Sequence, residues 1–128
     1  MVSSASSGSI LPLQLIFQGK TTMVVPNYVK AREAVKKGWD LTNLENHWSN
    51  QTTMKRFVEK VLDPWRVEKC KELGLDSSKQ KMVWLIDCWK VHTSEEFRNW
   101  LKENHPLVHY FYVATNCPSK LQPVDVVL

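Results

Sequence analysis

Two aspartates and one histidine are the residues whose types and positions could carry chemistry in this sequence. Asp87 directly follows the apolar run MVWLI, His92 comes five residues later, and Asp125 lies in the segment SKLQPVD. Paired carboxylates supply the oxygen ligands that Mg²⁺ requires. Two such ions about 4 Å apart can activate a water or hydroxyl for attack on a phosphodiester.

Each of these residues also has a plainer interpretation. Asp87 could accept hydrogen bonds from the turn that follows its strand. Asp125 could be the N-cap of a helix that begins at the end of the chain. His92 could form a hydrogen bond near Asp87, or it could only shape the turn. Position in the sequence does not decide between these roles.

The elements that must position Asp87 are two strands and the helix between them. The apolar run predicts a strand over residues 81–86 that is buried on both faces. The segment TSEE predicts a capping box, with Thr93 as N-cap and Glu96 at N3, followed by a helix. That helix ends at Pro106, and residues 107–114 predict the second strand.

A strand, a helix and a strand at this spacing favour a parallel, adjacent pair of strands. The carboxyl ends of parallel strands meet at one edge of a sheet, where ligands and catalytic groups gather. Asp87 stands at one such end, and the loop that carries Asp125 leaves the neighbouring strand. The two carboxylates are therefore expected at the same edge, although they are far apart in the sequence.

The first part of the chain predicts a hairpin and a long connection. Residues 10–17 read as a strand after a Ser/Gly-rich turn, and Met1 and Val2 read as the end of its partner strand. Residues 19–48 show no sustained apolar period, so they predict a long loop with a short helical turn at residues 30–36.

Helical spacing begins after this connection. Apolar residues from Met54 onward lie on one face of a predicted helix, which Ser49 or Thr52 can cap. Pro64 is expected to break or kink this helix, and Gly74 to end its second piece.

Composition restricts the class of protein. The 128 residues are the size of one domain, and 43% hydrophobic with 23% charged residues is typical of a globular chain. A net charge of +4 permits a polyanionic partner without requiring one. Three cysteines without a CxxC pair argue against a disulfide framework or zinc module and favour a reducing intracellular compartment. No signal peptide and no membrane-spanning run are predicted.

Three segments in order resemble the DDE superfamily endonuclease domain of pogo/Tigger-type transposases. They are LPLQLIFQGK at residues 11–20, LIDCWKVH at residues 85–92 and SKLQPVD at residues 119–125. The resemblance covers nearly the whole chain. It implies an α/β fragment of a ribonuclease H-like fold over residues 1–128, with a mixed sheet containing a hairpin, a βαβ unit and flanking helices.

The same resemblance assigns roles to the three candidate residues. Asp87 matches the second metal-binding and catalytic acid of the family, and Asp125 matches the third. His92 matches the histidine that commonly follows the second acid, which makes it a supporting residue. The cofactor implied is Mg²⁺ or Mn²⁺.

Two departures from the family pattern bear on activity. Cys88 stands where the family usually has Asn, which removes a polar group beside the metal. No residue matches the first acid, which the family carries on its first strand; Asp40 and Asp63 lie in the wrong segments. The chain therefore reads as a domain truncated at both ends, in which the hairpin and the parallel pair lack the strand that would join them.

The resemblance implies a nuclear protein that binds DNA, with metal-dependent strand cleavage and transfer, and homo-oligomers, in its intact relatives. This chain is expected to be inactive by itself. An alternative is a transposon-derived module that binds nucleic acid or protein without chemistry, favoured by the net charge, the basic residues 30–37 and Cys88. A third is an unrelated small α/β interaction domain, favoured only if Asp87 and Asp125 lie far apart.

Overall fold

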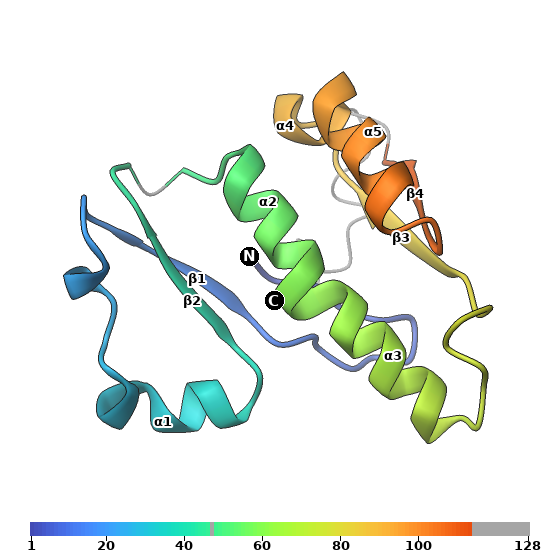
Figure 1. Ribbon diagram of the computed structural model, residues 1–128, viewed down its shortest axis with the longest axis horizontal. Helices are drawn as coiled ribbons and strands as arrows, with labels where there is room; N and C mark the ends of the chain where they lie inside the picture. Colours follow the sequence, from blue (N-terminus) through green and yellow to red (C-terminus); the bar gives the residue numbers. More distant parts are fainter. Residues whose placement is uncertain (47, 114–128) are drawn as a thin grey trace. The chain divides into compact units, whose positions relative to one another are not determined.

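The computed structural model describes residues 1–46 and 48–113 of the chain. The chain divides into two compact units, Met1–Leu62 and Asp63–Leu128, and each contains a pair of parallel strands. Figure 1 shows the elements of both units. Among the helices of the described residues, none is long and apolar enough to cross a membrane.

Unit 1 begins with the predicted hairpin. The backbone N–H of Leu11 donates to the carbonyl oxygen of Ser3 at 2.9 Å, and that of Gln14 donates to Met1 at 3.2 Å. Ser4 and Ile10 form an antiparallel bridge around the turn. The regular strand β1 (Gln14–Gln18) is shorter than expected and starts after Pro12, which cannot donate a ladder hydrogen bond.

The helical turn predicted at residues 30–36 is confirmed, but the rest of the long loop predicted over residues 19–48 is wrong. This stretch contains the 3₁₀ turn η1 (Thr22–Val24), the helix α1 (Tyr28–Lys36) and the strand β2 (Asp40–Leu44). In Figure 1 the chain leaves β1, passes through α1 and returns as β2 beside β1, with which β2 pairs in parallel.

The sequence pattern did not indicate β2 because the stability of this strand comes from backbone pairing and a polar contact. The strand DLTNL has no alternation of apolar residues, and its first residue, Asp40, is buried in an ion pair with Arg56. Helix α1 ends at Lys36, and Gly38, two residues later, has a φ of +75°, the left-handed conformation of a C-terminal cap. The Gly38 and Trp39 N–H groups then reach the carbonyl oxygens of Val35 and Ala34.

Helix α2 (Gln51–Phe57) is capped by Asn50, and neither Ser49 nor Thr52 is the cap. The Asn50 side chain accepts from the Thr53 N–H at 3.1 Å, while the Thr53 hydroxyl accepts from the Asn50 N–H at 2.8 Å. This reciprocal pair is a capping box in which Thr takes the N3 position usually held by Glu or Gln. Ser49 instead bonds the Thr53 hydroxyl at 2.8 Å.

The interruption expected near Pro64 takes the form of a π-helical turn. This turn, η2 (Val58–Leu62), comes directly before α3 (Asp63–Glu72), so Pro64 occupies the first turn of a helix, where its missing N–H costs least. The predicted end at Gly74 is confirmed: Gly74 donates to Lys71 and Leu75 donates to Cys70. The most completely buried apolar side chains of this region are Met54, Phe57, Val58, Val61 and Leu62.

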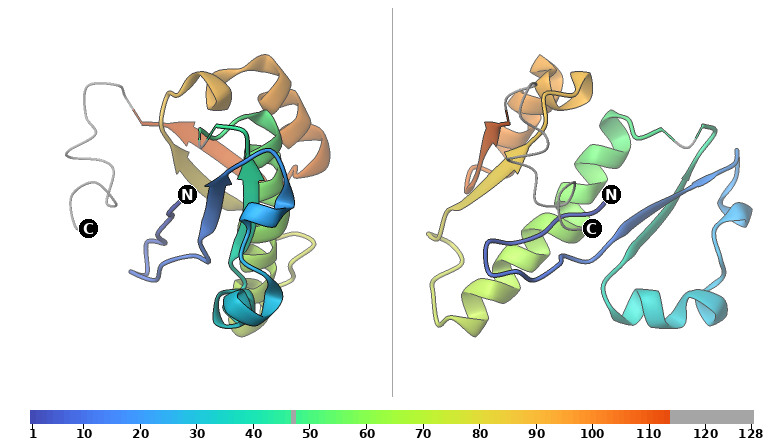
Figure 2. Two further views of the ribbon diagram at one scale, coloured as in Figure 1. Left: turned by 90° about the vertical axis from the view of Figure 1, so that its left-hand side faces the viewer. Right: turned by 180° about the vertical axis from the view of Figure 1, so that it is seen from behind.

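Unit 2 contains the predicted βαβ arrangement. Strand β3 (Met82–Ile86) pairs in parallel with β4 (Val108–Tyr112), and helices α4 (Lys90–Thr93) and α5 (Glu95–Asn104) connect them. Figure 2 shows α5 beside this strand pair in both views. Its Phe97 ring lies against the Trp84 ring of β3, with centroids 6.5 Å apart, and both side chains are buried.

Burial of β3 on both faces was predicted, and this is wrong. Trp84 and Ile86 are buried, whereas Val83 and Leu85, on the opposite face, are 62% and 61% exposed. Successive side chains of a strand point to opposite faces, and α5 covers one of them. The prediction failed because the run MVWLI contains no polar residue to mark the uncovered face.

The described strands form two separate two-stranded sheets. Among the described residues no strand joins the first pair to the second, which agrees with the expectation that the strand between the hairpin and the parallel pair is missing. The mixed α/β architecture, with short strands and several helices, is the one expected for a ribonuclease H-like fragment.

Candidate metal site at the end of β3

Asp87 is placed at the carboxyl end of β3, directly after Ile86. The strand is fastened there by β4, because the Val113 N–H donates to the Ile86 carbonyl oxygen at 2.8 Å. The Asp87 side chain is 50% exposed, so the backbone is held while the carboxylate still reaches solvent. A carboxylate on a fixed strand end that remains accessible can coordinate a cation.

His92 contacts this carboxylate directly. Its Nδ1 lies 2.6 Å from Asp87 Oδ1, and since a carboxylate can only accept, Nδ1–H is the donor. Of the two interpretations left open by the sequence, the structure shows the hydrogen bond. The second oxygen, Oδ2, accepts no hydrogen bond from the described residues and is available to a further ligand.

The His92 ring is fixed by aromatic neighbours. It lies edge-on to Trp89 with centroids 5.3 Å apart, and it contacts Phe97 at 6.2 Å and Trp84 at 6.4 Å. The side chain is nearly buried, so it has little freedom to turn away from Asp87. Such a histidine fixes the orientation of the carboxylate, as outer-shell hydrogen bonds do for metal ligands.

Two further contacts join residues 88–92 to the last residue of β4 and the residue after it. The Tyr112 hydroxyl donates to the His92 carbonyl oxygen at 2.8 Å, and the Cys88 thiol donates to the Val113 carbonyl oxygen at 3.2 Å. Partial burial raises the pKa of the Tyr112 hydroxyl above its ordinary value. The Cys88 thiol thus has a structural role, because it bonds the residue directly after β4.

The second predicted ligand, Asp125, lies outside the described residues, so its meeting with Asp87 stays a prediction. Within residues 1–46 and 48–113, no group of three or more His, Cys, Asp or Glu side chains could hold a metal ion.

Asp40 and Asp63 are not substitutes for the unmatched first acid, because both have structural roles. Asp40 receives Arg56 Nε at 2.9 Å on each oxygen and Gln14 Nε2 at 3.0 Å on Oδ2. Asp63 bonds Arg66 Nε at 2.7 Å and lies 3.3 Å from His105 Nδ1. Their charges are already compensated by these partners.

The Asp40–Arg56–Gln14 cluster had not been identified from the sequence. Its members come from β2, α2 and β1, and their separations follow no motif. The arginine is the partner that balances Asp40, and the hydrogen bond between them raises the pKa of the Arg56 guanidinium.

No curated protein and no solved structure matches this chain. A family model described as DDE superfamily endonuclease matches residues 1–128, the full length of the sequence. The match does not distinguish pogo/Tigger-type members from others, so that subtype stays a prediction. The chain belongs to the DDE superfamily endonucleases.

Proposed function

We propose that this chain is a DNA-binding domain of transposase type in which Asp87 is the metal-binding acid and His92 orients it. The contact that carries this proposal is the 2.6 Å hydrogen bond between His92 Nδ1 and Asp87 Oδ1. It fixes one carboxylate oxygen of a half-exposed side chain and leaves the other without a hydrogen bond from the described residues, at the carboxyl end of a parallel strand, the edge where such sheets place ligands.

The free Oδ2 of Asp87 is a hard oxygen donor, which fits Mg²⁺ or Mn²⁺. DDE superfamily endonucleases typically use divalent metal ions, and Asp87 together with Asp125 would hold one here. Such an ion supplies a Lewis acid for phosphodiester chemistry. The contribution of this chain is to hold the Asp87 carboxylate in one orientation through His92 and the α4 turn.

We further propose that the chain does not cleave DNA by itself and that it acts in the nucleus, where its substrate lies. The sequence has matches for two of the three acids of the family. Cys88, where the family usually has Asn, uses its thiol to contact Val113. A non-catalytic module that binds nucleic acid is the second candidate, and this use of Cys88 favours it.

Metal binding is tested by adding Mn²⁺ to the ¹⁵N-labelled chain and following paramagnetic broadening of its amide signals. We expect selective broadening around residues 86–92, lost in Asp87→Asn and kept in Glu103→Gln, a matched exposed acid on α5. Broadening that persists in Asp87→Asn would exclude Asp87 as the ligand.

Catalysis is tested by incubating plasmid DNA with the purified chain and Mg²⁺ or Mn²⁺. We expect no nicking. Clear nicking that disappears in Asp87→Ala would overturn the proposed inactivity. DNA affinity is then measured against salt concentration. We expect it to weaken as salt rises, and an affinity that is insensitive to salt would exclude an electrostatic phosphate-binding surface.

A further inference from the structure

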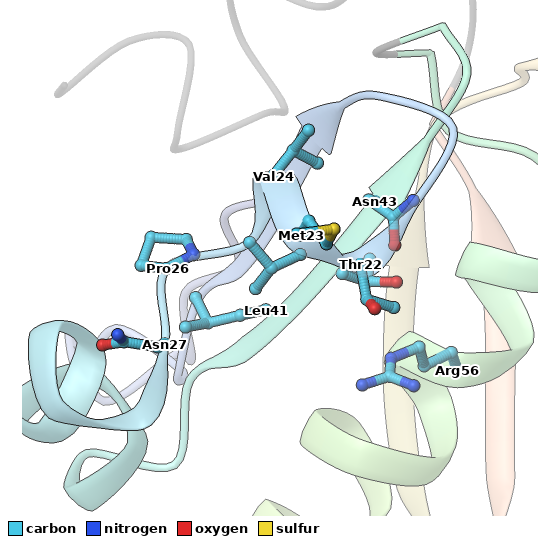
Figure 3. A pocket seen from close by; sticks show the side chains of 10 residues that line it. Thr22, Met23, Val24, Pro26, Asn27, Leu41, Asn43 and Arg56 are labelled. Atoms are coloured by element: carbon cyan, nitrogen blue, oxygen red, sulfur yellow. The ribbon is translucent and has the colours of Figure 1, made fainter.

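Unit 1 contains a pocket of about 830 Å³, and neither Asp87 nor its contacts are among the residues that line it. Its walls come from the η1 loop, the strand β2 and the single α2 residue Arg56 (Figure 3). This volume is within the range of about 300–1,000 Å³ typical of ligand sites. The lining residues are Thr22, Met23, Val24, Val25, Pro26, Asn27, Leu41, Thr42, Asn43 and Arg56.

The η1 wall of the pocket is fitted closely to the end of β1. A Cβ atom on Gly19 would overlap both Cγ atoms of the Val24 side chain, so glycine is the residue that permits this approach. The Asn43 side-chain amide donates to the Gly19 carbonyl oxygen at 2.9 Å. The loop is thus tied to β2 as well, and the pocket is largely formed before any ligand binds.

Arg56 presents a fixed hydrogen-bond donor at this pocket. Its Nε and Nη2 are taken by Asp40, at 2.9 and 2.6 Å, and the Asp40 side chain is only 5% exposed. Gln14, which is fully buried, holds Asp40 from the other side. Arg56 Nη1 has no hydrogen-bond partner among the described residues, and 42% of the side chain is exposed.

The charge and lining of the pocket restrict the ligand. Asp40 compensates the guanidinium charge, so a bare phosphate gains less here than at a free arginine. Half of the lining side chains are apolar; Figure 3 shows them on the η1 loop and β2, with Arg56 on α2 at another part of the wall. A planar guanidinium beside an apolar wall suits a flat heterocycle with a carbonyl acceptor, because arginine both stacks on rings and donates in their plane.

We propose that this pocket receives an unpaired nucleobase of single-stranded DNA. The inference rests on the proposed function in taking DNA as the partner, and it adds a base-binding site that shares no residue with the metal site. Arg56 Nη1 donates to an exocyclic oxygen of the base, and the apolar wall formed by the η1 loop and Leu41 covers the ring.

The test compares two fluorescently labelled oligonucleotides of equal length and charge, oligothymidylate and an abasic strand, by anisotropy at one salt concentration. We expect the wild-type chain to bind oligothymidylate about fivefold or more tightly, because a stacked base contributes about 1–3 kcal/mol. Thr22→Glu places a carboxylate in the pocket and should remove this preference. Thr52→Glu, with the same change at an exposed α2 position outside the pocket, should keep it.

Arg56→Lys supplies a second variant, because it keeps the positive charge beside Asp40 but removes the guanidinium. It should bind the abasic strand like wild type and lose the preference for oligothymidylate. If Arg56→Lys does not fold, as judged by circular dichroism, Thr22→Glu decides. Equal wild-type affinity for both strands, or a preference that survives in the pocket variants, overturns the base site alone. Failure to bind either strand overturns both the base site and the proposed DNA binding.

Discussion

The Tyr112 hydroxyl donates a 2.8 Å hydrogen bond to the backbone carbonyl oxygen of His92. This contact joins the last residue of β4 to the α4 turn, whose histidine holds Asp87. Tyr112→Phe keeps the ring and removes the donor. We expect a loss of about 1 kcal/mol in the free energy of unfolding, measured by urea denaturation, because one partly buried hydrogen bond is removed. No change in the unfolding midpoint would show that the contact is not formed in solution.

The same hydroxyl predicts a dependence of stability on pH. Partial burial raises the pKa of Tyr112 in the folded chain above the ordinary value of about 10. The folded state therefore favours the neutral phenol more than the unfolded state does. This contribution is fully present below about pH 10 and is lost as the pH rises through the folded pKa. Urea denaturation at pH 8 and at pH 10.5 should show a larger drop for wild type than for Tyr112→Phe; equal drops would contradict this assignment.

The buried Asp40–Arg56 ion pair is expected to contribute more to the free energy of unfolding than an exposed ion pair does. Asp40→Ala leaves the Arg56 guanidinium without its partner and Gln14 without one acceptor, so we expect a loss of about 2–3 kcal/mol in unfolding free energy. The matched control is Glu45→Ala, whose carboxylate pairs with Lys20 at 3.2 Å while both side chains are largely exposed. That change should cost less than about 0.5 kcal/mol. Equal losses would mean that Asp40 is not buried as described.

Much of unit 2 could be predicted because its signals are local. The apolar run before Asp87, a cap residue before the next helix and Pro106 after it each act over a few residues. Unit 1 could not be predicted in the same way, since β2 pairs with a strand more than twenty residues earlier and buries its Asp40 against Arg56 from a later helix. No window of sequence contains both the strand and the contacts that stabilise it.

The candidate site likewise has one feature that the sequence predicted and one that it left open. The position of Asp87 at a strand end followed from the order of the elements. The contact with His92 could not be decided from sequence, because five residues of separation are compatible with a side chain on either side of the turn. The structure decides it by enclosing the ring between Trp84, Trp89 and Phe97.

The N-cap of α5 is Ser94, one residue after the cap that the sequence predicted. The motif TSEE predicted Thr93 as N-cap, but Thr93 is the last residue of α4, and the Ser94 hydroxyl accepts from the Phe97 N–H at 3.2 Å. The extended backbone of Ser94, with φ of −62° and ψ of 143°, is the geometry of an N-cap. We expect Ser94→Ala to lower the unfolding free energy by about 1 kcal/mol and Thr93→Ala to lower it by less. Paired urea denaturation curves measure both variants, and a larger loss for Thr93→Ala would restore the cap position that the motif indicated.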